Sequence, residues 1–121
     1  MTTGEAEMII SQEVCKISHA SNGRGPEKIQ CKLIDDMILI KLIGNLSYRD
    51  KLLIKSENGH NLLKECRYLT ILSFKDLIGL FVKKILDVEL KDICYDLSRS
   101  TYEEIIVFCF DNVPKIKNKK Q

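Results

Sequence analysis

Tryptophan is absent from the 121-residue chain and only 7% of its residues are aromatic, so leucine, isoleucine and valine must fill any core. Long apolar runs are also missing. The longest, residues 105–110, has six residues, whereas a membrane-spanning helix needs about 20. The first residues do not combine a basic segment with an apolar run, as a signal peptide would. We therefore expect a cytoplasmic chain that does not span a membrane.

Closely spaced cysteine pairs, which would indicate a zinc site or a disulfide framework, are missing as well. The cysteines are odd in number and lie within apolar patterns, where a reduced thiol packs as a small apolar group. The chain contains no phosphate loop ending in GK[ST] and no G-x-S-x-G elbow. We expect no metal, no cofactor and no catalytic residues. The five cysteines are Cys15, Cys31, Cys66, Cys94 and Cys109.

The net charge of +2 comes from the end of the chain. Residues 115–121 contain four lysines, so 15 of the 19 basic residues remain in the rest of the chain, against 17 acidic ones. A nucleic-acid-binding domain carries its basic stripe on the folded part. We therefore expect no nucleic-acid partner, a single domain at residues 1–113 and a disordered basic tail at 114–121.

Capping patterns and apolar periodicity place the first elements. Thr2 with Glu5 predicts the start of a helix, which Asn22-Gly23 ends. Alternation over residues 28–35 and an apolar run over 37–43 predict two strands of a hairpin, joined at Asp35-Asp36. Ser47 with Asp50 predicts a short helix to about residue 54.

A long helix is predicted from about residue 60, after a break at Asn58-Gly59, to residue 86. Strands are predicted at residues 90–97 and 105–110. The order helix, strand, strand, helix, strand, strand predicts an α+β fold. In this fold a four-stranded antiparallel sheet packs against the one long helix.

The long helix carries apolar residues on two sides, and a sheet covers only one of them. We assign to the sheet the broader face of Leu62, Cys66, Leu69, Leu77, Leu80, Phe81 and Ile85. The second stripe has two open interpretations: it contacts another copy in a homodimer, or the N-terminal helix covers it within the chain. This candidate interface consists of Leu72, Gly79, Val82 and Leu86.

Two short segments are candidate ligand sites. In Gly23-Arg24-Gly25-Pro26, a guanidinium beside flexible backbone amides could hold a phosphate or carboxylate. The alternative is a helix cap and turn in which Arg24 pairs with a structural carboxylate. Asp35 and Asp36 could bind a metal or act as a base, or they could bond their own backbone in a turn.

Several segments in order resemble the MpsC-like family, over roughly residues 5 to 112. They include Gly23-Arg24-Gly25-Pro26, Asp35-Asp36-Met37 and Glu103-Glu104-Ile105-Ile106. The resemblance implies an accessory component of a bacterial system that generates membrane potential by moving cations, a system also linked to inorganic carbon uptake. The chain departs from the family where glycines usually stand. It has Leu86-Asp87 and Thr101-Tyr102-Glu103 at those turns.

Three functions are therefore weighed. The first is a non-catalytic accessory or regulatory module that forms a homodimer and assists a membrane transport protein. The second is a sensor of small anions that uses the Arg24 loop. The third, an enzyme using Asp35 or Asp36, lacks any indicated substrate.

Overall fold

The computed structural model describes residues 1–116, so most of the predicted basic tail lies outside the described residues. Pro114 is buried and Ile116 packs against the main core, which places packed residues beyond position 113. Within residues 1–116, no helix is long and apolar enough to cross a membrane.

The first helix, α1 (Thr3–Asn22), begins at the predicted capping box. Thr2 Oγ1 accepts a hydrogen bond from the Glu5 backbone N–H, and Glu5 Oε1 accepts one from the Thr2 N–H. The helix ends at Gly23, whose φ of 74° lies in the left-handed region that favours glycine. The predicted cap at each end is confirmed.

Four strands form one antiparallel sheet, as predicted, in the order β1-β2-β4-β3. Asp35 occupies the β1–β2 turn with a φ of 51°, a value that aspartate tolerates better than most residues. The strands are β1 (Lys28–Ile34), β2 (Met37–Ile43), β3 (Leu90–Leu97) and β4 (Glu104–Phe110).

The predicted single long helix is wrong. Two helices, α3 (Glu57–Leu72) and α4 (Lys75–Leu86), meet at Ser73 and Phe74 and follow the short α2 (Tyr48–Leu53). Asn58-Gly59 lies inside the first turn of α3 and does not break it. A Cβ at Gly59 would stand 1.9 Å from the Leu53 carbonyl oxygen, so glycine permits the close approach of α3 to α2.

The assignment of the helix faces is also wrong. Leu62 and Leu80 are each 70% exposed, whereas Val82 and Leu86 are buried in the main core. Val82 and Leu86 of the stripe proposed for a partner therefore pack within the chain, where α4 contacts both α1 and β3. Most of the face assigned to the sheet points outward, but Phe81 is buried in the main core and Ile85 packs against it.

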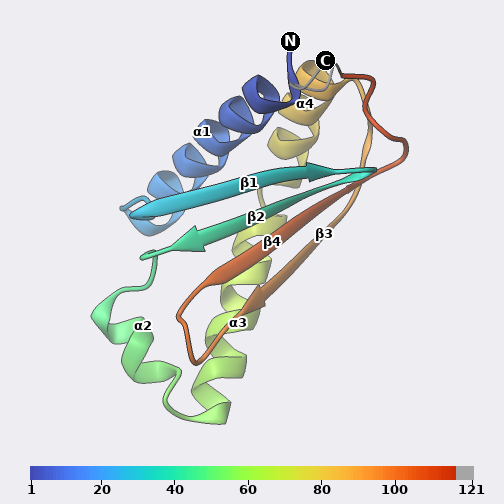
Figure 1. Cartoon of the computed structure of the whole chain (residues 1–121). Helices are drawn as coiled ribbons and strands as arrows, with labels where there is room; N and C mark the ends of the chain where they lie inside the picture. Colours follow the sequence, from blue (N-terminus) through green and yellow to red (C-terminus); the bar gives the residue numbers. More distant parts are fainter. Residues whose placement is uncertain (117–121) are drawn as a thin grey trace.

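The helices α1, α3 and α4 cover one face of the sheet, and α2 lies beyond its end (Figure 1). The main core joins Ile10 and Val14 of α1, Ile38 and Ile40 of β2, and Phe108 of β4. A second, smaller cluster under α2 contains Leu46, Ile54, Leu63 and Leu97. Between these two clusters lies a group of polar side chains.

Candidate functional site

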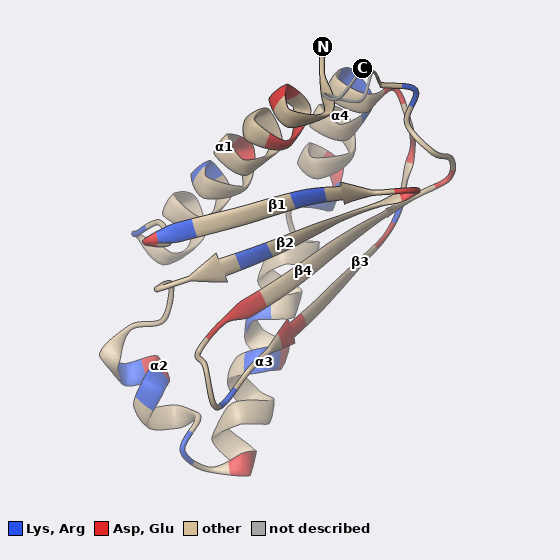
Figure 2. Cartoon of the chain, in the orientation of Figure 1, with Lys and Arg blue, Asp and Glu red and all other residues tan. Residues whose placement is uncertain are grey.

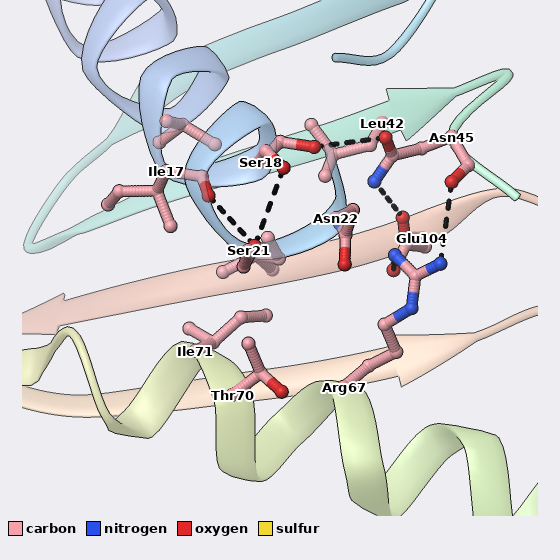
Figure 3. Close-up of a pocket in the computed structure, with 12 residues that line it drawn as sticks. Ile17, Ser18, Ser21, Asn22, Leu42, Asn45, Arg67, Thr70, Ile71 and Glu104 are labelled. Carbon is pink, nitrogen blue, oxygen red and sulfur yellow. Dashed lines mark hydrogen bonds and ion pairs between the residues drawn. The ribbon is translucent and has the colours of Figure 1, made fainter. Parts of the chain in front are cut away.

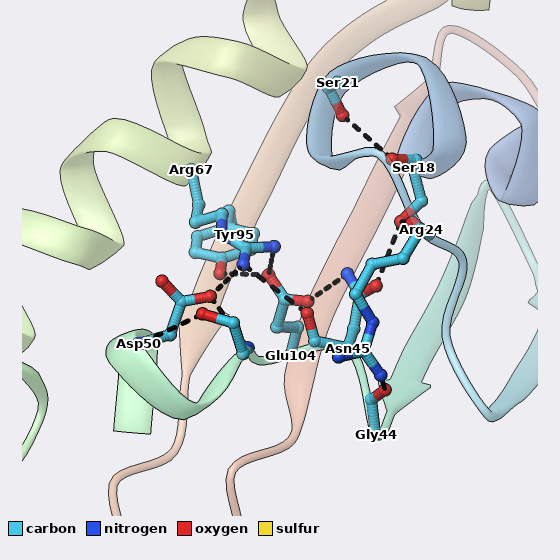
Figure 4. Close-up of polar contacts among 10 residues, drawn as sticks. Ser18, Ser21, Arg24, Gly44, Asn45, Asp50, Arg67, Tyr95 and Glu104 are labelled. Atoms are coloured by element: carbon cyan, nitrogen blue, oxygen red, sulfur yellow. Dashed lines mark hydrogen bonds and ion pairs between the residues drawn. The ribbon is translucent and has the colours of Figure 1, made fainter. Parts of the chain in front are cut away.

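Glu104 occupies the helix-covered face of the sheet at the start of β4 and is 1% exposed. A buried carboxylate is costly unless it is paired and hydrogen-bonded. Its Oε1 accepts a bond from Asn45 Nδ2 at 2.6 Å, and its Oε2 accepts one from the Tyr95 hydroxyl at 2.6 Å. Arg67 Nη1 approaches the same Oε2 at 3.3 Å. Glu104 is therefore held by three donors from three segments (Figure 4).

Arg67 joins this carboxylate to a second one. It projects from the middle of α3 with its side chain 11% exposed, and its Nη2 donates to Asp50 Oδ2 at 2.7 Å. Asp50 also accepts from the Ser47 N–H at 3.0 Å in the capping box of α2. One guanidinium thus ties α2 and α3 to the start of β4.

Asn45 extends the network to the end of α1. Ser18 Oγ lies 3.0 Å from Asn45 Oδ1 and 3.0 Å from the Arg24 carbonyl oxygen. Because a serine hydroxyl has one proton, it donates to one of these two oxygens at a time. Asn45 is 2% exposed, so this contact fixes the loop after β2 against α1 inside the protein.

Tyr95 is a hydrogen-bond donor in this network. Burial, the charge of Glu104 and the hydrogen bond to it all raise the pKa of Tyr95 above its ordinary value. The phenol therefore keeps its proton and donates a hydrogen bond to the carboxylate. Within the described residues, every buried side-chain nitrogen and oxygen has a hydrogen-bond partner.

An open cleft of about 320 Å³ lies beside the network, between the end of α1, the start of α2 and α3. Arg24 is an exposed residue at its rim, and its Nη2 donates to the Gly44 carbonyl oxygen at 3.0 Å. Arg24 makes no ion pair within residues 1–116, so the predicted pairing with a structural carboxylate is absent there. The cleft is lined by Ser21, Asn22, Arg24, Asn45, Ser47, Asp50, Leu63, Cys66, Arg67 and Thr70.

A smaller cavity of about 30 Å³ lies on the α1 side of Glu104, with room for about one water molecule. Ile17, Leu42 and Ile71 make its lining largely apolar, while Ser18, Asn45 and Glu104 provide polar atoms (Figure 3). The large cleft offers guanidinium, hydroxyl and amide donors to an anion. The small cavity does not have the volume for one.

The four candidate ligand residues do not form one site. Arg24 and Gly25 precede β1, whereas Asp35 and Asp36 follow it, and the seven-residue strand between them spans about 23 Å. A Cβ at Gly25 would stand 2.7 Å from His19 Nε2, so this glycine allows the loop to pack against α1. No three histidine, cysteine, aspartate or glutamate side chains within the described part of the chain could together hold a metal.

The four candidate interface residues are divided between core and surface. Val82 is 0% and Leu86 3% exposed, so neither is free to contact a partner. Leu72 is partly buried against the core, and Gly79 has open space where a Cβ would lie. The second interpretation of the stripe, in which α1 covers it, agrees with the packing of α1 on α4.

The network residues were not predicted, although two signals for them exist. Glu104 falls in phase with Ile106 and Phe108, the buried positions of β4. Arg67 falls between Leu63 and Ile71 at helical spacing. A charged residue in phase with a buried stripe indicates a buried polar contact.

One known protein family covers all the helices and strands described above. The family model described as "Na+-translocating membrane potential-generating system (MpsC)" matches residues 2–112, which is nearly the whole chain. No curated protein and no solved structure matches the chain.

Proposed function

The chain belongs to the MpsC family, and from this premise we propose its function. We propose that it is a non-catalytic accessory or regulatory module of a Na+-translocating system that generates membrane potential. The match over residues 2–112 carries this proposal, because it includes every helix and strand of the domain. The partner we propose is a membrane transport protein of that system.

The polar network supports the non-catalytic part of the proposal. A catalytic carboxylate or phenol needs an atom that can reach a substrate and exchange a proton with it. Both oxygens of Glu104 instead accept hydrogen bonds from within the chain, one of them from the Tyr95 hydroxyl. This arrangement is suited to fixing the loops around α2 against the sheet.

The test is complementation in the source cell. Cells without this chain should show a reduced Na+-dependent membrane potential, measured with a potential-sensitive dye, and the restored wild-type chain should recover it. An unchanged potential in the deletion strain would overturn the proposed role. Co-purification from detergent-solubilised membranes then identifies the transport protein.

The alternative function, a sensor of small anions, is favoured by one observation. Arg24 stands at the rim of the 320 Å³ cleft with no ion pair within residues 1–116, beside hydroxyl and amide groups. A small oxyanion there would receive charge-assisted hydrogen bonds from its guanidinium. The Arg24 loop, a candidate ligand site from the sequence, thus borders the cleft.

Thermal unfolding with inorganic phosphate or acetate tests this alternative. Arg24→Ala is compared with Arg49→Ala, since Arg49 is also exposed but does not line the cleft. A sensor should be stabilised by one of the anions in the wild type and in Arg49→Ala, and not in Arg24→Ala. Equal behaviour of all three proteins would exclude the Arg24 site.

A further inference from the structure

The face of the sheet opposite the helices carries an apolar centre. Leu39 of β2 is paired with Val107 of β4 in the middle of the sheet, and both are only partly buried. In Figure 1 this face is turned toward the viewer, and no helix crosses it. From β1 to β3, its three paired rows are Ile34-Met37-Cys109-Asp92, Lys32-Leu39-Val107-Cys94 and Gln30-Lys41-Ile105-Asp96.

Opposite charges mark the two margins of this open face. Lys28 and Lys32 lie along β1, while Asp92 and Asp96 lie along β3 (Figure 2). Asp96 is paired with Lys64 of α3 at 3.0 Å. Within the described residues, Lys28, Lys32 and Asp92 make no ion pair. Three charges at the margins are thus left for a partner.

The central strands carry a single charged side chain on this face. Lys41 lies in the third row, and its Nζ is 4.0 Å from Glu103 Oε1 in the turn before β4. Because that ammonium group leans toward a carboxylate at the end of the sheet, it leaves Leu39 and Val107 as an apolar centre of the middle row.

Several backbone amides at the two edges of the sheet are already hydrogen-bonded to side chains. At the β1 edge, the Leu33 N–H donates to Glu7 Oε2 at 2.7 Å. At the β3 edge, the N–H groups of Ile93 and Leu97 donate to the side chains of the aspartates that precede them. Unpaired edge amides are what strand addition requires. Strand addition at either edge would have to displace these contacts, whereas a partner on the open face would not.

Symmetry selects one arrangement of two copies. Sheets that pack face to face lie about 10 Å apart, with their strands within about 30° of each other. A two-fold axis along the strands places β1 of one copy over β3 of the other, so lysines meet aspartates. An axis across the strands would place β1 over β1, so lysines would meet lysines.

We propose that the open face binds a second copy of this chain, with the two-fold axis along the strands. Leu39 of each copy then packs against Val107 of the other, and Lys32 reaches toward Asp92. Four strands of seven or eight residues give a footprint of about 19 Å by 23 Å. This is about half the 800 Å² or so that each partner buries in a standard interface, so we expect a dimer with a dissociation constant in the micromolar range.

Sedimentation equilibrium between about 1 and 100 µM tests the proposal. The wild type should shift from monomer to dimer across this range, and Leu39→Glu should remain a monomer because it buries a charge at the centre. Leu62→Glu is the matched control, since Leu62 is 70% exposed on the outer side of α3 and should leave the dimer intact. Circular dichroism checks that each variant folds.

The charges at the margins test the orientation of the axis. Lys32→Asp should weaken the dimer about tenfold, and the exchange K32D with D92K should restore it.

A wild type that is monomeric at 100 µM would overturn the proposal, as would a dimer that survives Leu39→Glu and is lost in Leu62→Glu. A monomer that binds anionic lipid vesicles through Leu39 would overturn it in favour of a membrane surface. An exchange that fails to restore a dimer weakened by Lys32→Asp would overturn the two-fold arrangement.

Discussion

The two faces of the sheet hold their charged side chains in contrasting ways. On the covered face, Glu104 is 1% exposed and accepts hydrogen bonds from Asn45, Tyr95 and Arg67. On the open face, Lys32 and Asp92 lie at opposite margins without an ion pair among the described residues. Burial makes an unpaired charge too costly to keep, whereas exposure leaves a charge available to a partner. Each prediction below tests one part of this contrast.

The largest difference is expected between two neighbours on β4. Phe108 points into the main core and is 1% exposed, while Val107 points to the open face. Phe108→Ala should lower the free energy of unfolding by about 3–5 kcal/mol, because it leaves a cavity. Val107→Ala should cost about 1 kcal/mol or less in dilute monomer. Urea denaturation measures both, and equal losses would contradict the assignment of the faces.

The next largest effect concerns the arginine of the network. Arg67→Ala should lower the free energy of unfolding by about 3 kcal/mol, because Glu104 stays buried without its cation. Lys64→Ala on the same helix removes an exposed ion pair with Asp96 and should cost about 0.5 kcal/mol. The same urea experiment serves as the measurement. A loss for Arg67→Ala no greater than that for Lys64→Ala would show that the network is not needed for stability.

Cysteines on the two faces of the sheet should react with an alkylating reagent at different rates. Burial raises the pKa of the Cys31 thiol, on the covered face of β1, to about 12. Cys94 is exposed on the open face of β3. At pH 8 iodoacetamide should modify Cys94 at least tenfold faster, because the thiolate is the reactive form. Peptide mass spectrometry over time follows the two sites, and faster modification of Cys31 would contradict its burial.

The smallest effect is the pH dependence due to Asp96. The hydrogen bond with Lys64 and the Leu97 N–H lower the pKa of Asp96 below its ordinary 3.8. A lowered pKa contributes stability above the unfolded value, and that stability is lost as the pH falls through the folded value. Because the side chain is 67% exposed, the contribution should be about 0.5 kcal/mol or less. Asp96→Asn should remove this loss between about pH 5 and pH 3 in urea titrations, and an unchanged pH profile would exclude it.

Local signals in the sequence predicted most of the fold. The capping boxes at Thr2 and Ser47 and the alternation in β1 depend on neighbouring residues, so they can be read along the chain. The break at Ser73 and Phe74 could not be predicted. The buried stripe of Leu63, Ile71 and Ile78 keeps one helical phase across it, with neither proline nor glycine at the break.

The faces of α3 and α4 and the polar network depend on contacts between distant segments. Four exposed leucines, Leu62, Leu69, Leu77 and Leu80, recur on the outer face, so apolar periodicity alone assigned much of that face to the sheet. Glu104 meets Asn45 across 59 positions and Arg67 across 37, distances at which one sequence shows no pairing. Arg24, a candidate ligand residue from the sequence, borders a cleft, whereas Asp35 and Asp36 lie at the other end of β1.

The central claim is that the buried network holds the domain together and performs no chemistry. Its most direct test is the membrane potential of cells whose only copy of the chain carries Tyr95→Phe, which removes the phenol from Glu104 and keeps the ring. With the variant shown to be folded by circular dichroism at the growth temperature, we predict a Na+-dependent potential equal to that of the wild type. A folded variant that fails to restore the potential would contradict the claim.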